Sequence, residues 1–541
     1  MVLLTEHTLK KIKKIKGGEM VVGDIVRNNA RNYPKKTSFI FESNRFTWAQ
    51  TDERVNRLAN FLLSLGLKSQ DPVGLLSRNC HQWFETAFAV AKAGLKLVPL
   101  NMAFVAAELE QIANDAGIKV LIVEDTKVEI ANELKKKCPT VETLIGICHD
   151  KEHGLENDFE KIIENGKPQD PNIEVSKDDV FLHIYTSGTT GVPKGAMLTH
   201  YNNVSEGICA GYEFRLLPHD IALSALPLYF IGGWGGTALP ALVRGCTHVI
   251  INFDPDKFLE TVQREKVSYT ILVPTIINIL INHPDLEKYD LSSIRVIPFA
   301  GSPLPVELWK RAAAKFGNVF QSIYGLTEVC ATITVLPPEE VSLEGDAKKV
   351  ERLASIGKAM IGSAARVVDD DMNDIKPGSG EVGEIVLRGN TVMKGYWNAP
   401  EITEETFRGG WLHTGDLAQV DEDGFIYITD RKKDLIISGG KNVYPREVEE
   451  VLYKHEAILD ACVIGVPDEK WGETVKAVVV LKEGKNVAEE EIIEFCKQHL
   501  ASYKKPTSVD IVKELPRTSS GKILKRKVRE KYWEGKESKL V

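Results

Sequence analysis

One segment of the chain has the residue types of a phosphate-binding loop. Residues 185–195 read Tyr-Thr-Ser-Gly-Thr-Thr-Gly-Val-Pro-Lys-Gly and combine hydroxyl side chains, glycines and one lysine. The amides and hydroxyls of such a loop can surround phosphate oxygens. It is not a Walker A loop, because Lys194 follows a proline and precedes a glycine. A strand-like run over 180–184 leads into the segment, which favours a phosphate loop over an ordinary polar turn.

Further motifs follow in a fixed order. Ser322–Glu328 contains an aromatic ring, a hydroxyl and a carboxylate, and hard cations such as Mg²⁺ prefer oxygen ligands of this kind. Glycine within Phe299–Pro303 would permit close approach of the backbone to a flat ring. The remaining motifs are Trp411–Asp416, Arg431 in a charged connector, Ser438–Asn442 and Pro516–Lys522. Together they resemble the adenylate-forming superfamily of acyl-CoA synthetases, luciferases and peptide-synthetase adenylation domains, from about residue 25 to residue 527.

This resemblance implies an ATP-dependent, AMP-forming acid–thiol ligase. Such an enzyme converts a carboxylic acid and ATP into an acyl-adenylate and pyrophosphate, and then transfers the acyl group to coenzyme A. ATP, Mg²⁺ and coenzyme A are therefore the expected cofactors. No Ser–His–Asp arrangement is required, because positioning and electrostatics supply most of the rate enhancement.

The resemblance also assigns roles to individual residues. The implied phosphate-binding residues are Thr186, Ser187, Gly188, Thr189, Thr190, Gly191, Lys194 and Thr327. The implied adenosine-binding residues are Gly301, Ser302, Pro303, Ser322, Tyr324, Gly325, Asp416 and Arg431. Tyr324 is expected to stack near adenine and Asp416 to accept hydrogen bonds from the ribose, which Arg431 also reaches. Glu328 and Thr186 are the implied Mg²⁺ ligands.

Four residues are expected to be catalytic: Lys522, Thr186, Glu328 and Lys194. By resemblance, Lys522 moves to the acid carboxylate and the α-phosphate, where a positive charge stabilises the charge that builds up on oxygen. The small domain is expected to rotate about a hinge at Lys433, so that Gly439 and Gly440 line the passage for the pantetheine arm of coenzyme A. Lys441 departs from the pattern, since many relatives carry glutamate there.

The resemblance implies an acyl pocket that comprises Phe230, Gly232, Trp234 and Gly325. The segment 230–234 holds no charge that could pair with an α-ammonium group, which disfavours amino acids as substrates. Gly325 and the glycines at 232, 233, 235 and 236 predict room for a larger apolar tail. Trp234 is either a gate or ordinary core packing, and Phe230 replaces a histidine that is common in relatives. A medium- or long-chain fatty acid is the favoured substrate, and an aromatic or alicyclic acid is the alternative.

The elements that must position these residues predict an α/β fold. Helical spacing over 54–62 and 257–265 alternates with strand-like runs over 119–123, 267–273 and 294–299. The polar stretch 139–178 is expected to be a surface excursion. A change of pattern near residue 430 predicts a large N-terminal multi-layer α/β domain (1–430) and a small mobile α+β C-terminal domain (431–541).

Bulk properties limit the class of protein further. A net charge of −8 gives no reason to expect a nucleic-acid partner. The eight scattered cysteines form no CxxC pair, which favours a reducing, cytoplasmic location. The uncharged segment 221–243 is long enough to span a bilayer, but its glycines and prolines favour a buried segment over a membrane transporter. The lysine-rich segment 9–16 allows weak membrane-surface contact, and a monomer or homodimer is expected.

Two alternatives share the same adenylation motifs. One is an acyl-AMP ligase that loads a carrier protein, which often has an insertion hindering domain rotation; none is obvious between residues 330 and 430. The other is a luciferase-like oxygenase. A non-catalytic nucleotide-binding module is disfavoured, because Lys522, Glu328 and Asp416 are all present.

Overall fold

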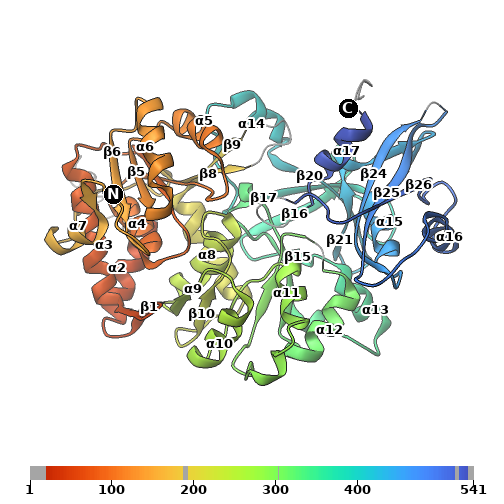
Figure 1. Ribbon diagram of the computed structural model, residues 1–541, viewed down its shortest axis with the longest axis horizontal. Helices are drawn as coiled ribbons and strands as arrows, with labels where there is room; N and C mark the ends of the chain where they lie inside the picture. Colours follow the sequence, from red (N-terminus) through yellow and green to blue (C-terminus); the bar gives the residue numbers. More distant parts are fainter. Residues whose placement is uncertain (1–19, 187–192, 303, 469, 518–522, 534–541) are drawn as a thin grey trace, which may run out of the picture. The chain divides into compact units, whose positions relative to one another are not determined.

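The computed structural model describes residues 20–186, 193–302, 304–468, 470–517 and 523–533 (Figure 1). The chain forms two compact units, each built from several stretches of sequence. The first contains Met1–Thr270, Leu326–Ala331 and Asn390–Pro400, and the second contains Ile271–Gly325, Thr332–Gly389 and Glu401–Val541. The motif at 322–328 is therefore divided, because the chain passes from the second unit to the first between Gly325 and Leu326.

The largest sheet belongs to the first unit and has the strand order β18-β9-β8-β4-β3-β5-β6-β7. The strands are β18 (Gly395–Tyr396), β9 (Lys194–Thr199), β8 (Val180–Thr186), β4 (Lys96–Pro99), β3 (Pro72–Leu76), β5 (Val120–Glu124), β6 (Thr143–Ile147) and β7 (Asn157–Asp158). From β8 to β7 the strands are parallel, whereas β9 and β18 are antiparallel to their neighbours. Every residue of β3 and β5 is buried, as expected for parallel strands covered on both faces.

A smaller sheet of the first unit has the order β10-β11-β1-β2. Its strands are β10 (Ile221–Ser224), β11 (Thr247–Ile250), β1 (Thr37–Phe41) and β2 (Asn44–Thr47). Helices of this unit are α2 (Val22–Asn32), α3 (Trp48–Ser64), α4 (His81–Lys92), α5 (Ala106–Ala116), α6 (Val128–Lys137), α7 (Phe159–Asn165), α8 (His200–Glu213), the π-helix η2 (Gly232–Ala238), α9 (Leu239–Val243), α10 (Pro255–Glu265), and the short η1 (Asp125–Lys127) and η4 (Thr327–Val329). Helix α4 is buried along its whole length and contacts strands of both sheets.

The second unit holds three sheets. They have the orders β12-β13-β14-β15, then β16-β17-β20-β19 with β21 paired to β20, and finally β23-β22-β25-β24 with β26 paired to β25. The strands are β12 (Ile297–Phe299), β13 (Phe320–Tyr324), β14 (Thr334–Leu336), β15 (Lys358–Ala359), β16 (Ser363–Val368), β17 (Gly383–Gly389), β19 (Phe407–Arg408), β20 (Trp411–Val420), β21 (Ile426–Arg431), β22 (Ile436–Ser438), β23 (Lys441–Val443), β24 (Ile458–Asp468), β25 (Gly472–Leu481) and β26 (Ser508–Val512).

Helices accompany these sheets. They are α11 (Pro274–Ile281), α12 (Val306–Phe316), α13 (Ala347–Glu351), α14 (Pro400–Thr406), α15 (Pro445–Leu452), α16 (Glu489–His499), α17 (Lys525–Trp533) and the short η3 (Leu286–Lys288), η5 (Pro338–Glu340), η6 (Arg352–Ala354) and η7 (Lys432–Asp434). The apolar faces of α15 and α16 pack on β24 and β25 in one buried cluster that includes Val448, Ile492, Val463 and Val479. The predicted domain boundary at residue 430 stays a prediction.

The structure confirms the predicted helices at 54–62 and 257–265 and the strands at 119–123 and 180–184. Two expectations are wrong. The stretch 139–178 contains the buried strand β6 and helix α7, because its polar flanks hide a short apolar run. Residues 267–273 form only isolated bridges, Tyr269 with Ala222 and Leu272 with Phe299, since the chain leaves the first unit between them. Residues 221–243 form β10, η2 and α9, and no described helix has the length and hydropathy needed to cross a membrane.

Candidate active site

The predicted phosphate loop begins and ends on a β-hairpin of the first unit. Strands β8 and β9 are antiparallel, and their last pair before the loop is Thr186 with Lys194. The Thr186 hydroxyl donates to the Lys194 carbonyl oxygen at 3.4 Å. The structure therefore brings together two of the predicted phosphate ligands. The predicted residues Ser187, Gly188, Thr189, Thr190 and Gly191 lie outside the described part of the chain.

The base of this hairpin is closely packed. A Cβ atom at Gly195 would lie 2.2 Å from Nε2 of the buried His183, so a larger residue at position 195 would displace that ring. Burial, with a smaller contribution from the Lys96 charge, lowers the pKa of His183 to about 3, and the imidazole is therefore neutral near pH 7. The Trp397 amide donates to the Gly195 carbonyl at 2.8 Å. These contacts fix the strand that carries Lys194.

Glu328 lies in η4, which contacts β9 within the first unit. Its Oε1 accepts a hydrogen bond from the Tyr396 hydroxyl at 2.6 Å, and its backbone carbonyl accepts one from the Met393 amide at 2.8 Å. No lysine or arginine forms an ion pair with Glu328 among the residues that the structure describes. A half-buried carboxylate with no described cationic partner suits the predicted role as a Mg²⁺ ligand, with Thr186 as the second oxygen donor.

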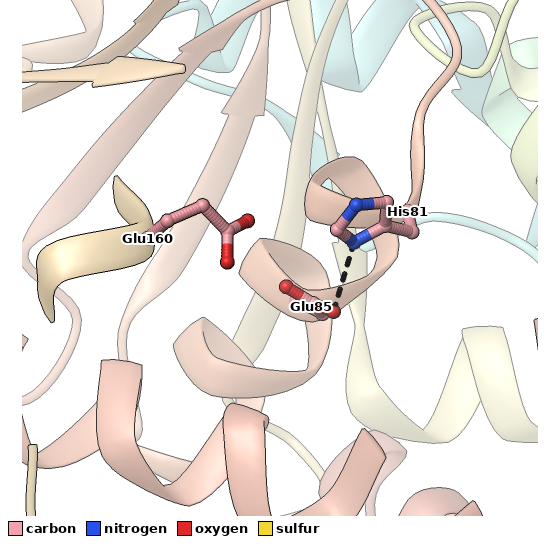
Figure 2. A group of neighbouring side chains, drawn as sticks. All are labelled: His81, Glu85 and Glu160. Carbon is pink, nitrogen blue, oxygen red and sulfur yellow. Dashed lines mark hydrogen bonds and ion pairs between the residues drawn. The ribbon is translucent and has the colours of Figure 1, made fainter. Parts of the chain in front are cut away.

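Another group of metal-ligand side chains, His81, Glu85 and Glu160, has a different explanation. Figure 2 shows the His81 Nδ1 atom directed at Glu85, 3.0 Å from its Oε1. The guanidinium of Arg54 donates to Glu85 at 2.7 Å and to Glu160 at 2.8 Å. Burial alone would raise the pKa of Glu85, but His81 and Arg54 lower it to about 2. Because Arg54 already pairs with both carboxylates, this group is explained as an ion-pair network and not as a metal centre.

The second unit brings together three residues from separate motifs. Asp416, whose side chain is 5% exposed, accepts a hydrogen bond from the Tyr324 hydroxyl at 2.6 Å and one from Arg431 Nε at 3.0 Å. The pairing of β20 with β21 places Arg431 opposite Asp416. Burial and the Asp416 charge raise the pKa of Tyr324 well above its usual value, so this hydroxyl stays a donor. A carboxylate held in this way is a fixed acceptor, as the ribose-binding prediction requires.

The other predicted adenosine-binding residues lie on neighbouring segments. Gly301, with φ 92°, has a backbone conformation that favours glycine, while Ser302 is exposed. Ser322 is buried on β13. Gly325, which directly follows β13 and is the last residue before the chain enters the first unit, is half-buried. Pro303 lies outside the described residues. The adenine contacts of this group stay predictions.

The predicted acyl segment is more crowded than its glycines suggested. A Cβ atom at Gly233 would lie 2.2 Å from the Pro227 carbonyl oxygen, and one at Gly235 would lie 2.2 Å from that of Cys330. These two glycines therefore permit close backbone packing and do not provide room for a tail, contrary to the sequence-based expectation. Gly232 differs, because the nearest atom to an added Cβ is 3.9 Å away.

Trp234 is fully buried in the first unit. Its ring lies 5.4 Å from that of Trp83 and 5.8 Å from that of Phe181, and its Nε1 donates to Asn203 Oδ1 at 2.9 Å. Core packing accounts for these contacts, and a gating role is not needed to explain them. Phe230 is half-buried beside Tyr229, and its place in the acyl pocket stays a prediction.

The predicted coenzyme A and hinge residues lie in the last third of the chain. Lys433 is in η7, directly after β21. Gly439 and Gly440 have φ values of 56° and 75°, and Gly439 packs against the Trp471 ring. The Lys441 ammonium lies 4.7 Å from the centroid of the Tyr503 ring, so this departure from the family pattern has an aromatic partner. Lys522 lies outside the described residues, and the sequence did not point to Tyr396 at all.

Comparisons with known proteins identify the family. The AMP-binding enzyme family matches residues 26–397, and the AMP-binding enzyme C-terminal domain matches residues 447–522. A feruloyl-CoA synthase of Amycolatopsis sp is 37% identical over 93% of this chain and 97% of its own. A long-chain-fatty-acid–CoA ligase of Mycobacterium tuberculosis is 33% identical, with 94% and 98% covered.

A solved structure agrees with these matches. ATP-bound MatB from Rhodopseudomonas palustris superposes with a TM-score of 0.84 at 29% identity, with 95% of this chain and 99% of that chain covered. The predicted fold class, a large N-terminal α/β domain and a small C-terminal domain, is thereby confirmed. The chain belongs to the AMP-binding enzyme family and is an ATP-dependent, AMP-forming acyl-CoA synthetase.

Proposed function

We propose that this synthetase activates an apolar monocarboxylic acid, with a medium- or long-chain fatty acid as the favoured substrate. The supporting observation is the segment 230–238, which contains no charged residue. Its polar side chains, Trp234 and Thr237, donate to Asn203 and to the Gly232 carbonyl. The segment has no charged side chain that could pair with an ammonium or a second carboxylate, and an apolar tail is the chemistry that suits it.

In the proposed first half-reaction, an oxygen of the acid attacks the α-phosphorus of Mg-ATP, and pyrophosphate leaves. Lys194 and the hydroxyls of the phosphate loop would bind the phosphates, and Asp416 would orient the ribose. Glu328 and Thr186 would hold the Mg²⁺ that accompanies ATP, and this cation would offset phosphate charge. Lys522 would place a further positive charge at the attacking carboxylate, which lowers the barrier electrostatically.

In the proposed second half-reaction, the thiol of coenzyme A attacks the acyl carbon, and AMP leaves. The small domain would rotate about Lys433 between the two steps, so that Gly439 and Gly440 replace Lys522 near the acyl group. A rotation of this kind lets one site serve two reactions in turn.

An aromatic carboxylic acid is the second candidate. Two observations favour it: one of the relatives described above is named as a feruloyl-CoA synthase, and Gly233 and Gly235 are closed by backbone contacts. A shorter, flatter acid needs less space than a fatty chain. The same uncharged segment suits both classes.

The deciding experiment measures pyrophosphate release with Mg-ATP across acids from acetate to palmitate, with benzoate, ferulate and cyclohexanecarboxylate, each with and without coenzyme A. Turnover that requires coenzyme A and peaks at a medium or long chain supports the favoured substrate. A peak at the ring acids supports the second candidate. A single burst that coenzyme A does not change contradicts coenzyme A as acceptor, and would favour a carrier protein or luciferase-like chemistry.

A further inference from the structure

We propose that Tyr396 is a positioning residue that holds the Glu328 carboxylate in place for Mg-ATP and ties it to the strand that carries Lys194. The proposal rests on the ATP-binding role proposed above. Its starting point is the 2.6 Å hydrogen bond from the Tyr396 hydroxyl to Glu328 Oε1. The two residues are 68 positions apart in the sequence, so neither motif contains the other.

The backbone around Tyr396 is bonded both to the strand of Lys194, a predicted phosphate ligand, and to Glu328, a predicted Mg²⁺ ligand. Strand β18 pairs with β9 and places Tyr396 opposite Ala196, two residues after Lys194. Just before the strand, the Met393 amide donates to the Glu328 carbonyl at 2.8 Å. The segment 393–397 is therefore bonded to the Lys194 strand on one side and to Glu328 on the other.

The Tyr396 side chain continues this connection. The Lys194 ammonium lies 5.6 Å from the centroid of the Tyr396 ring, within the range of a cation–π contact. Burial and the Glu328 charge both raise the pKa of Tyr396, so the hydroxyl remains protonated and donates. One side chain thus contacts the cation and the carboxylate that are predicted to face the phosphates and Mg²⁺.

The type of donor explains why tyrosine suits this position. A lysine or arginine would also orient the carboxylate, but it would neutralise the charge, as Arg54 does for Glu85. The tyrosine hydroxyl is neutral, so it orients Glu328 without placing a positive charge beside it. Oε2 of Glu328 accepts no hydrogen bond from the described residues, which leaves this oxygen for a cation.

The test uses the full-length protein with Tyr396→Phe, which keeps the ring and the strand pairing and removes only the hydroxyl. Tyr453→Phe is the matched control, because the Tyr453 hydroxyl also donates to a carboxylate, Asp460 Oδ1 at 2.8 Å, and neither residue of this pair is predicted to bind ATP or Mg²⁺. Calorimetry measures ATP binding at increasing Mg²⁺ and in EDTA, and electron paramagnetic resonance measures Mn²⁺ bound with ATP. Thioester formation from supplied acyl-AMP and coenzyme A provides a reaction that involves neither ATP nor the metal.

For Tyr396→Phe we expect the Kd of Mg-ATP and the Mg²⁺ concentration at half-saturation to rise about tenfold, because a hydrogen bond to a charged group is lost. ATP binding in EDTA and thioester formation should stay within about twofold of wild type. Tyr453→Phe should match wild type throughout. Equal losses with and without metal, or an unchanged Mg²⁺ dependence, would overturn the proposal.

A double-mutant cycle covers the case in which Tyr396→Phe disturbs folding. In a Glu328→Gln background the Tyr396→Phe change should have no further effect on Mg-ATP binding, because the charged partner is already gone. An additional tenfold loss in that background would show that Tyr396 acts through packing. Absence of Mg-ATP binding by the wild type would instead contradict the proposed function itself.

Discussion

Two groups of residues that are predicted to bind ATP each contain a tyrosine hydroxyl 2.6 Å from a carboxylate. In the second unit Tyr324 donates to Asp416, and in the first unit Tyr396 donates to Glu328. They differ in what else contacts the carboxylate. Arg431 pairs with Asp416, whereas no described lysine or arginine pairs with Glu328. The same donor therefore serves a compensated hydrogen-bond acceptor in one group and an uncompensated charge in the other.

This difference follows from what each carboxylate is expected to bind. A ribose presents neutral hydroxyl donors, so the binding carboxylate needs a fixed direction and loses little when a guanidinium shares its charge. A Mg²⁺ ion is attracted by the charge itself, and a guanidinium on the same carboxylate would repel it. We call Tyr324, Asp416 and Arg431 the nucleoside group, and Glu328, Tyr396 and Lys194 the phosphate group.

The largest expected effect is that of replacing Lys522, which belongs to neither the nucleoside group nor the phosphate group. Lys522→Ala should slow acyl-adenylate formation by about 100-fold or more, because it removes the positive charge at the reacting oxygens. Thioester formation from supplied acyl-AMP should remain within a few-fold of wild type. The measurement is single-turnover kinetics of each half-reaction. Equal loss in both would show that Lys522 holds the protein together and does not act on the first step alone.

The next prediction compares the two carboxylates directly. Glu328→Gln should raise the Mg²⁺ concentration at half-saturation by about 10- to 100-fold, since the neutral amide cannot replace the charge. Asp416→Asn should weaken ATP binding by about tenfold at every Mg²⁺ concentration, because it alters acceptors and not a metal ligand. Both are measured by calorimetry with ATP over a Mg²⁺ series. If both variants shift the Mg²⁺ dependence equally, the proposed division of roles is wrong.

The sequence was sufficient to find every residue of these two groups except Tyr396, but not the contacts between them. Tyr324, Asp416 and Glu328 belong to motifs whose order and residue types are recognisable without a structure. Tyr396 was missed, because its role depends on strand pairing with β9 and on a partner 68 residues away. No local spacing reports such a contact. A tyrosine after a glycine in a short segment gives no signal by itself.

The glycine run at 232–236 shows a second limit of the sequence. Glycine is compatible with empty space and with close backbone contact, and the pattern cannot separate the two. In the structure Gly232 adjoins space, whereas Gly235 packs on the carbonyl of Cys330, two residues after Glu328. The strand β6 was missed for a related reason, because its polar flanks concealed an apolar run that is short but buried.

The close contact between Gly235 and the Cys330 carbonyl predicts a smaller effect, on protein stability and on the phosphate group alone. Gly235→Ala should reduce the free energy of unfolding by about 1–3 kcal/mol, because the new methyl group displaces the backbone at Cys330. Displacement of the segment 326–331 should also weaken Mg-ATP binding. The matched control is Gly232→Ala, which should leave stability nearly unchanged and shift the preferred acid toward shorter tails. Urea unfolding and the acid panel measure both variants, and equal destabilisation by the two would contradict the packing difference.

The last prediction concerns His183, the buried histidine that packs against the Lys194 strand, and the pH dependence of the stability to which it contributes. The folded pKa of His183 is about 3 and its ordinary value is 6.5, so the unfolded chain binds more protons between these values. The stability that this histidine contributes is present above pH 6.5 and is lost as the pH falls toward 3. At pH 4.5 wild-type protein should lose about 2–3 kcal/mol through this group.

His183→Leu removes the titrating ring. Neither ring nitrogen has a hydrogen-bond partner among the described residues, so an apolar side chain leaves no described partner unpaired. At pH 7.5 the variant should unfold at a urea concentration close to that of wild type, and at pH 4.5 it should be the more stable of the two. His248→Leu, at a buried histidine on β11 with a pKa of about 3, should show the same gain in stability. Of these two histidines, His183 is the one that packs against the Lys194 strand, at Gly195. Its replacement alone should therefore also change the pH dependence of ATP binding. If both variants or neither change ATP binding at low pH, acid acts on the phosphate group by another route.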